Sequence, residues 1–247
     1  MTYFLSGCPL AVGEVFEWSG AEAHHAVGSR RIRPGEELSL QDPQGRRFRA
    51  ALEGQSRKSL TVRVLAPEAV PPLPGCRVTL LQGAVKAKAA GEIVQKITEL
   101  GVARLAFFPA ERSTVSPREL ESGKTQTRWE RIAWEACKQC GRQFPPELTV
   151  AGGLAEALAL TDPAAANWMF HPGEASAVPV LPAAKGTPAP ASARLLVGPE
   201  GGWTAEEVRQ AAGAGFRPVG LGGMILRAET AAVAACSLAL FGPGAAD

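Results

Sequence analysis

The sequence predicts an α/β protein in which a small unit of strands precedes a larger unit built on a parallel sheet. In the first seventy residues, short runs with strand composition are separated by turn signals. After residue 76, strand-like runs alternate with helical patterns. The stretch 66–75 between them holds four prolines in ten residues, the composition of a semi-rigid linker. We therefore predict two domains, residues 1–70 and residues 76–247.

Each strand of the first domain is predicted from a short run beside a turn signal. The turns include Arg33-Pro-Gly and Asp42-Pro-Gln-Gly. The predicted order is a strand at 15–18, a helix at 21–28 and strands at 37–41, 46–52 and 60–65. Strands of this length and spacing predict a small β-barrel or sandwich.

In the second domain the alternation of strands and helices implies crossover connections, and hence a parallel sheet with helices on its faces. The predicted strands are 78–81, 105–108, 168–170, 194–197 and 218–221. The predicted helices are 91–100, 129–139, 154–160, 205–212 and 228–241. The segment 173–193, rich in Ala and Pro, is predicted to be a surface loop.

The composition is that of an ordinary globular protein and does not favour disorder. Of its 247 residues, 46% are hydrophobic and 20% charged, and the net charge is +2. Most of the 26 basic residues are arginines, whose planar fork suits phosphate and base edges. The start lacks the pattern of a signal peptide and no apolar run is long enough for a bilayer, so we expect a cytoplasmic protein that contacts no membrane.

Cysteines and histidines indicate neither a disulfide framework nor a metal site. The five cysteines are an odd number and widely scattered, which favours reduced thiols. Cys137 and Cys140 have a zinc or redox spacing, but they lie in a helical pattern without a second pair, so we interpret them as small helix residues. His24, His25 and His171 have no nucleophile motif nearby and are interpreted as ordinary histidines.

Two glycine-rich turns carry the functional interpretation, because parallel sheets bind ligands at the carboxyl ends of their strands. The first is Gly198-Pro-Glu-Gly-Gly-Trp203, after a predicted strand. Thr204 and Glu207 follow it with the spacing of a capping box, which predicts a loop held at a defined helix start. The second is Leu221-Gly-Gly-Met-Ile-Leu-Arg227, also between a strand and a helix.

These turns are not typical of phosphate loops. The sequence has no GxxxxGK[ST] motif, and Gly213-Ala-Gly follows a helix and is interpreted as its C-terminal cap. Glu200 would also repel a phosphate. The turns therefore favour a neutral or cationic ligand that is bound mainly through backbone atoms.

The two turns resemble the paired signature of SPOUT RNA methyltransferases. More narrowly, the chain is similar to the RsmE family, which methylates N3 of a uridine in small-subunit ribosomal RNA with S-adenosylmethionine. Other segments are similar to family blocks: His24-His-Ala-Val-Gly-Ser-Arg-Arg-Ile-Arg-Pro-Gly35, Ile93-Val-Gln-Lys-Ile-Thr-Glu-Leu-Gly-Val102, Glu111-Arg-Ser113 and Glu135-Ala-Cys-Lys-Gln-Cys-Gly-Arg142. Several ordered blocks are more specific than any single one.

The resemblance implies a PUA-like β-barrel before the linker, and after it a SPOUT α/β domain whose C-terminal segment forms a trefoil knot. It also implies a homodimer and a partner in 16S ribosomal RNA or the small ribosomal subunit. The residues it implies for S-adenosylmethionine are Val197, Gly198, Pro199, Glu200, Gly201, Gly202, Leu221, Gly222, Met224, Ile225, Leu226 and Arg227. For RNA binding we expect His25, Arg31, Arg33, Lys86, Arg112 and Arg142, of which Arg31 matches a position of the family. They belong with a basic strip that includes Arg46, Arg47 and Arg49, which taken alone is more often a solvated face of the barrel.

For catalysis we expect Arg227 to bind phosphate or stabilise the developing uridine anion. Glu229 or Glu200 would assist substrate orientation or removal of the N3 proton. Two positions depart from the family pattern, since Met224 replaces Arg and Ala228 replaces Thr. The second change would remove a possible helix N-cap worth about 1 kcal/mol.

These departures keep two alternatives open. One is a SPOUT-fold RNA-binding or ribosome-assembly protein with weak or altered methyltransferase activity. The other is a SPOUT methyltransferase that acts on transfer RNA.

Overall fold

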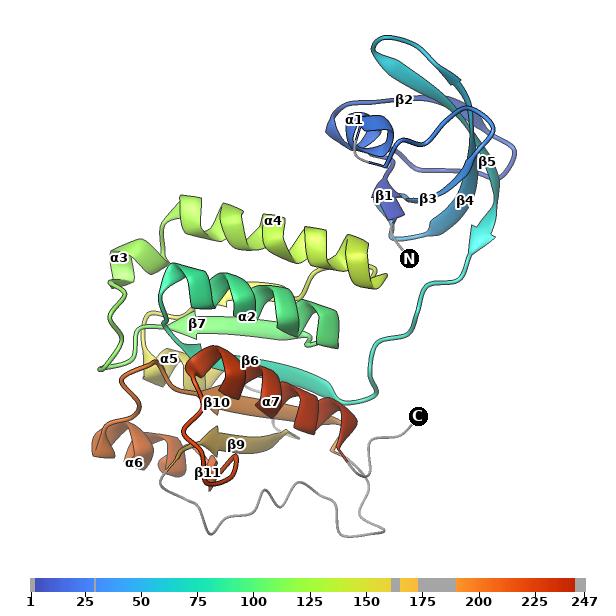
Figure 1. Cartoon of the computed structure of the whole chain (residues 1–247). Coiled ribbons are helices and arrows are strands. Elements are labelled where there is room, and N and C mark those ends of the chain that lie inside the picture. Colours follow the sequence, from blue (N-terminus) through green and yellow to red (C-terminus); the bar gives the residue numbers. More distant parts are fainter. Residues whose placement is uncertain (1–2, 29, 161–164, 173–189, 243–247) are drawn as a thin grey trace. The chain divides into compact units, whose positions relative to one another are not determined.

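The computed structural model describes residues 3–28, 30–160, 165–172 and 190–242. The chain forms two compact units (Figure 1). The first comprises Met1–Pro72 and Cys137–Phe144, and the second comprises Leu73–Ala136 and Pro145–Asp247. The segment 137–144, which the sequence analysis placed in the second domain, thus clusters with the first.

The first unit is a curled five-stranded sheet with one helix. Its elements are β1 (Tyr3–Leu5), β2 (Val15–Ser19), α1 (Ala21–Gly28), β3 (Glu37–Gln41), β4 (Arg47–Gln55) and β5 (Ser59–Glu68). The strand order is β1-β3-β4-β5-β2, with β1 parallel to β3 and the other neighbours antiparallel. In β5, Leu60, Val62 and Val64 alternate into the core, as expected for a strand with one buried face.

The curl of this sheet brings its two edge strands together. The Trp18 indole of β2 donates to the Leu5 carbonyl of β1 at 3.2 Å, and its ring meets Phe4 edge-on with centroids 5.7 Å apart. Among the described residues, β1 and β2 do not pair with each other as neighbouring strands. The predicted barrel is therefore observed as a curled half-barrel.

Residues 137–144 are fixed to this sheet through their own backbone carbonyls. The Tyr3 hydroxyl donates to the Arg142 carbonyl at 2.7 Å, and Arg47 Nη2 donates to the Gly141 carbonyl at 3.0 Å. The Arg47 guanidinium also lies over the Tyr3 ring, 4.0 Å from its centroid. Burial raises the pKa of the neighbouring Cys137 thiol to about 12, so this cysteine is an inert core residue.

The second unit is a six-stranded parallel sheet with helices on both faces. The strands are β6 (Arg77–Gly83), β7 (Arg104–Phe108), β8 (Glu147–Val150), β9 (Ala166–Phe170), β10 (Ser192–Val197) and β11 (Arg217–Val219). The helices are α2 (Ala87–Leu100), α3 (Pro117–Leu120), α4 (Gly123–Cys140), α5 (Leu154–Ala159), α6 (Ala205–Gly213) and α7 (Ala228–Phe241). The strand order is β11-β9-β10-β6-β7-β8, and all neighbours are parallel, so the predicted parallel α/β sheet is confirmed.

Two apolar cores cover the two faces of this sheet. On one face α2 and α7 lie side by side and bury residues such as Ile93, Ile97 and Cys236 (Figure 1). On the other face α5 and α6 pack against Met169 and Leu196. The central strand β10 is buried along its whole length, which explains its continuous apolar run.

Most predicted elements are present, with shifted ends. The linker is shorter than predicted because β5 continues to Glu68. The strands β1 and β8 and the short helix α3 were not predicted, and α2 and α4 begin earlier than expected. Most of the predicted loop 173–193 lies outside the described residues, and its last two residues belong to β10. No helix among the described residues is long and apolar enough to cross a membrane.

Candidate functional site

A cavity of about 740 Å³ lies where four parallel strands end. Its walls come from the segments after β6, β9, β10 and β11 and from the first turn of α7. From β6 the chain proceeds outward to β7 and β8, then returns to build β9 and β10 on the other side of β6. The cavity therefore stands at the point where the strand order reverses, the usual ligand position in an open α/β sheet.

The loop after β10 is fixed to two neighbouring strands, by a side chain of β6 and by a loop side chain that bonds to the backbone of β9. Gln82, at the end of β6, donates from Nε2 to the carbonyls of Gly83 at 2.9 Å and Gly198 at 3.0 Å. The buried Trp203 donates from its indole to the Phe170 carbonyl at 3.0 Å. These bonds fix the loop backbone, including Gly198 and Gly202, along this wall of the cavity.

The far end of this loop is fixed at the start of α6 as the sequence predicted. Thr204 accepts from the Glu207 amide at 3.2 Å, and Glu207 accepts from the Thr204 amide at 2.9 Å, so the capping box is confirmed. The same Glu207 carboxylate also accepts from the Glu111 amide, at 2.9 Å. At the other end of α6, Gly215 has a φ of 83°, which agrees with the predicted glycine cap.

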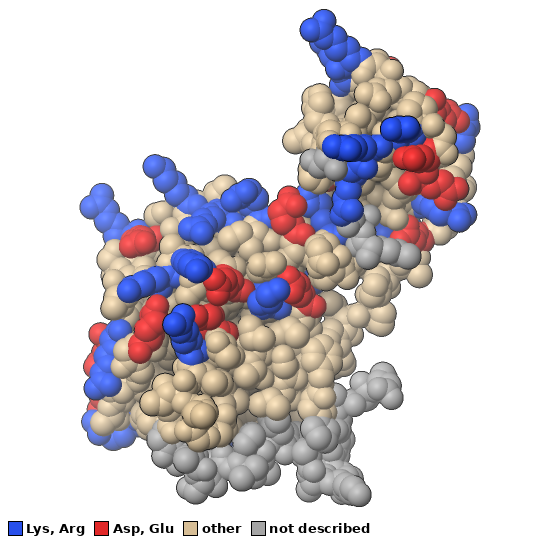
Figure 2. All heavy atoms as spheres, in the orientation of Figure 1, with Lys and Arg blue, Asp and Glu red and all other residues tan. Residues whose placement is uncertain are grey.

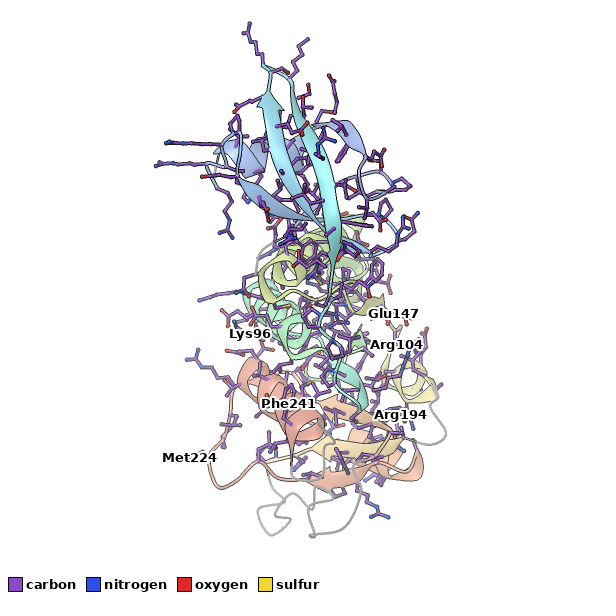
Figure 3. All side chains as sticks on the ribbon, turned by 90° about the vertical axis from the view of Figure 1, so that its right-hand side faces the viewer. Lys96, Arg104, Glu147, Arg194, Met224 and Phe241 are labelled. Carbon is purple, nitrogen blue, oxygen red and sulfur yellow. The ribbon has the colours of Figure 1, made fainter. Side chains whose placement is uncertain are left out.

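The loop between β11 and α7 forms the opposite wall. Met224 and Ile225 are 81% and 85% exposed, and Figure 3 shows Met224 at the outer edge of this loop. Arg227 is the N-cap of α7 and its side chain makes no capping bond. Ala228 is thus the first helical residue, so the expectation that position 228 serves as the N-cap is wrong.

The residues predicted to contact the cofactor come together at this cavity, except Gly201. The exception packs elsewhere, since a Cβ atom there would lie 2.7 Å from the backbone oxygen of Arg112. The three residues predicted for catalysis, Arg227, Glu229 and Glu200, all line the cavity. Glu200 is exposed and accepts from the backbone amide of Lys86 at 3.2 Å.

The cavity also contains an imidazole to which the sequence analysis gave no role. His171 directly follows β9 and lines the cavity with Lys86, Lys88, Glu92 and the three predicted catalytic residues. Its place at a strand end is the signal that could have revealed it, because the same rule identified both glycine-rich turns. No group of His, Cys, Asp and Glu that could hold a metal ion occurs in the described part of the chain.

Two of the residues predicted to bind RNA lie in the second unit. Lys86 lines the cavity, and Arg112 is exposed and donates from Nη1 to the Gly201 carbonyl at 3.4 Å. In the first unit, His25, Arg31 and Arg33 are exposed. Arg31 has a φ of 56°, an uncommon conformation for a residue other than glycine.

Arg142 differs from the other residues predicted to bind RNA. It is 7% exposed and donates to the Phe144 carbonyl at 2.6 Å, and burial lowers the pKa of its guanidinium. This burial argues against an RNA contact there. The wider basic strip is interrupted in the same way, because Arg47 is buried and Arg46 pairs with Asp42. Figure 2 shows that the Lys and Arg side chains visible on each unit are interleaved with Asp and Glu.

Comparisons with known proteins place the chain among RNA methyltransferases. The RNA methyltransferase domain family matches residues 71–240, and the RNA methyltransferase PUA domain family matches residues 19–65. Ribosomal RNA small subunit methyltransferase E of Mycobacterium bovis is 31% identical over 95% of this chain and 89% of the relative. The Bacillus subtilis protein of that name is 29% identical over 90% and 88%.

Two solved structures are similar over almost the whole chain. Ribosomal RNA small subunit methyltransferase E from Neisseria gonorrhoeae, bound to S-adenosyl methionine, has a TM-score of 0.81 and 30% identity, covering 96% of this chain and 95% of that one. A methyltransferase from Legionella pneumophila, in complex with the same cofactor, has a TM-score of 0.82 and 29% identity, covering 96% of both chains.

Proposed function

This chain belongs to the family of ribosomal RNA small subunit methyltransferase E, and we propose that it transfers a methyl group from S-adenosylmethionine to N3 of one uridine in 16S ribosomal RNA. It is an S-adenosylmethionine-dependent RNA methyltransferase. The observation that carries the proposal is the cavity at the reversal of strand order, between the two glycine-rich loops.

The cavity fits the cofactor in size and chemistry. Its volume of about 740 Å³ lies in the range of small-molecule sites. The walls at Gly198, Gly202 and Gly222 are bare backbone, which suits close approach of a nucleoside. S-adenosylmethionine, when bound, supplies a methyl group on a positively charged sulfur, and carboxylates such as Glu200 and Glu229 complement that charge. The residues proposed to hold it are Val197 to Gly202, Leu221, Gly222 and Met224 to Arg227, with Gly201 supporting the loop from outside.

Three side chains are proposed to act on the uridine. Arg227 ends the second loop with an exposed guanidinium, so it can bind a phosphate or stabilise the anion that develops on the base. Glu229, in the first turn of α7, and Glu200 orient the base or assist loss of its N3 proton. Because N3 lies on the Watson–Crick edge, the target uridine must be unpaired or extruded when it binds.

We propose residues 1–70 as an RNA-binding domain and 76–247 as the methyltransferase domain, with a trefoil knot in the C-terminal segment. His25, Arg31, Arg33, Lys86 and Arg112 would contact RNA, in the cytoplasm where ribosomes assemble. Met224, Ile225 and Phe241 are large apolar side chains that are at least 60% exposed, which supports a homodimer that covers them (Figure 3).

The test is to incubate the protein with labelled S-adenosylmethionine and undermethylated small subunits, then to identify the modified nucleoside. We expect labelled 3-methyluridine at one position of 16S RNA. Arg227→Ala should lower kcat/KM by about 100-fold or more while leaving the fold intact. Arg209→Ala, on the exposed surface of α6, is the matched control.

The other outcomes distinguish the alternatives. Absence of cofactor binding in calorimetry would favour an RNA-binding or assembly protein. Label in transfer RNA and not in 16S RNA would identify a methyltransferase of a different substrate class.

A further inference from the structure

The backbone holds His171 between the two loops of the proposed cofactor site. In the sheet register, Phe170 of β9 pairs with Val197 of β10 on one side and with Val219 of β11 on the other. His171 is the next residue along β9, and its amide donates to the Val219 carbonyl at 3.0 Å. It therefore stands beside the first residues of both loops.

The local sequence makes this position rigid. Pro172 follows His171, and a residue before proline is restricted to extended conformations. Proline also has no amide to continue the ladder, so the strand ends here. His171 is half-buried and lines the cavity, so its imidazole is held at the site by the sheet and not by a long loop.

The other ionisable groups of the cavity are less suited to accept a proton near neutral pH. Lys86, Lys88 and Arg227 are cations in their ordinary states, and Glu92 is on α2, where Lys88 approaches it at 4.0 Å. Glu200 accepts from the Lys86 amide, and Glu229 lies in the first turn of α7, near the positive end of the helix dipole. An imidazole ordinarily titrates between pH 5 and 8, which matches a general base to its task.

We propose that His171 is the general base of the reaction, an inference that rests on the proposed function. The unprotonated ring nitrogen accepts the N3 proton of uridine. The N3 electron pair forms the new bond to the methyl carbon while the carbon–sulfur bond breaks and its electron pair stays on sulfur. In this mechanism Glu200 and Glu229 orient the uracil ring. Arg227 stabilises the negative charge that develops on the carbonyl oxygens of the uracil.

The first experiment compares His171→Asn with the wild type at pH 7 on RNA that contains the target uridine. We expect kcat to fall by about 100-fold or more, within the range for general base catalysis. The affinity for S-adenosylmethionine, measured by calorimetry, should change by less than about threefold, because His171 is not proposed to bind the cofactor. The control is Arg209→Ala, on the exposed surface of α6 and outside the cavity lining, which should keep the wild-type kcat.

Three further readouts separate a general base from a structural residue. The wild-type kcat should rise with pH through the titration of an imidazole, and this step should be absent in His171→Asn. RNA with 5-fluorouridine, whose N3 proton is more acidic, should restore much of the lost rate in the variant. In NMR spectra, the His171 ring signals should shift when uridine RNA and the demethylated cofactor are added together.

The outcomes keep the two proposals apart. A wild type that methylates no uridine would end the proposed function. A wild type that methylates N3, together with a His171→Asn variant that retains its kcat and its pH step, would overturn only the role of His171. A variant that loses cofactor binding as strongly as activity would also overturn it, because His171 would then be a binding residue.

Discussion

At the scale of single residues, glycines set how closely the loops of the site approach the sheet. A Cβ atom at Gly83 would lie 2.7 Å from Pro199 Cδ and 2.9 Å from its backbone nitrogen. One at Gly198 would lie 3.0 Å from the Trp203 ring. The loop after β10 therefore packs directly on the end of β6, and the position of the cavity wall depends on the absence of two side chains.

This contact makes Gly83→Ala a specific test of the wall. The added methyl group collides with backbone, so the loop at Pro199 must move away from β6. We expect affinity for S-adenosylmethionine to fall by about tenfold or more, equivalent to at least about 1.4 kcal/mol, measured by calorimetry. Gly75→Ala is the control, because a Cβ atom there meets open space. Equal affinities for wild type and Gly83→Ala would mean that the loop is not part of the binding wall.

Individual site residues were predicted from the sequence to the extent that they lie in glycine-rich loops. The sequence did not predict that His171 lines the cavity, because an isolated histidine after a three-residue apolar run has many structural uses. Arg142 shows the opposite failure. Its charge indicated a surface contact, but only the packing of residues 137–144 reveals that it is buried.

At the scale of elements, one buried carboxylate joins the start of α6 to the loop after β7. Glu207 is 2% exposed and accepts from the amides of Thr204 and Glu111. The first bond belongs to the predicted capping box, while the second depends on tertiary structure. The Glu207 carboxylate thus connects two segments that are far apart in sequence, the loop after β7 and the start of α6. It therefore stabilises the far end of the loop after β10 as well as the helix.

Glu207→Gln should therefore cost more than removal of the hydroxyl partner. An amide offers one acceptor where two buried donors need one each, so we expect a loss of about 1–3 kcal/mol in the free energy of unfolding. Thr204→Ala should cost about 1 kcal/mol. Both are measured by urea denaturation. Glu206→Gln loses only exposed bonds to Arg209 and Gln210, so it should shift the urea midpoint much less than Glu207→Gln does. A Glu207→Gln variant as stable as Glu206→Gln would show that the second bond is not formed in solution.

The elements that the sequence did not predict share a physical reason. β1 has three residues and α3 has one turn, which is too short for a periodic pattern to stand out. β8 is an edge strand in which no residue is fully buried, and it follows directly after two prolines. Long helices and the buried strand β10 were predictable because their apolar residues repeat over several turns or fill a whole strand.

At the scale of the whole molecule, the first unit is built from two separate stretches of the chain. Three of its hydrogen bonds run from the buried residues Tyr3, Gln41 and Arg47 to backbone carbonyls of residues 141–143. Backbone acceptors have no side-chain signature. For this reason the sequence pattern placed residues 137–144 in the other domain.

A fragment of residues 1–72 tests this composition. Without residues 137–144, the side chains of Tyr3, Gln41 and Arg47 lose their acceptors and part of the surface that buries them; the three hydrogen bonds are together worth about 1.5–4.5 kcal/mol. Such a loss is comparable with the stability of a small domain. We expect poorly dispersed amide signals in NMR and no cooperative urea transition. A synthetic peptide of residues 137–144 should restore dispersion, whereas a peptide with the same residues in scrambled order should not. A fragment that folds without the peptide would contradict the prediction.

The two-part construction of the first unit also governs when it can fold during synthesis. The bond from Arg47 to the Gly141 carbonyl joins residues 94 positions apart. Domains made of one continuous stretch can fold as soon as they leave the ribosome, in order from the amino end. Here the amino-terminal unit has all five strands early, but it must wait for residues 137–144 before its buried donors find their acceptors. The strands β8 to β11 of the parallel sheet follow later in the chain. Such distant pairing slows folding, so the nascent chain exposes its first core for longer than its small size suggests.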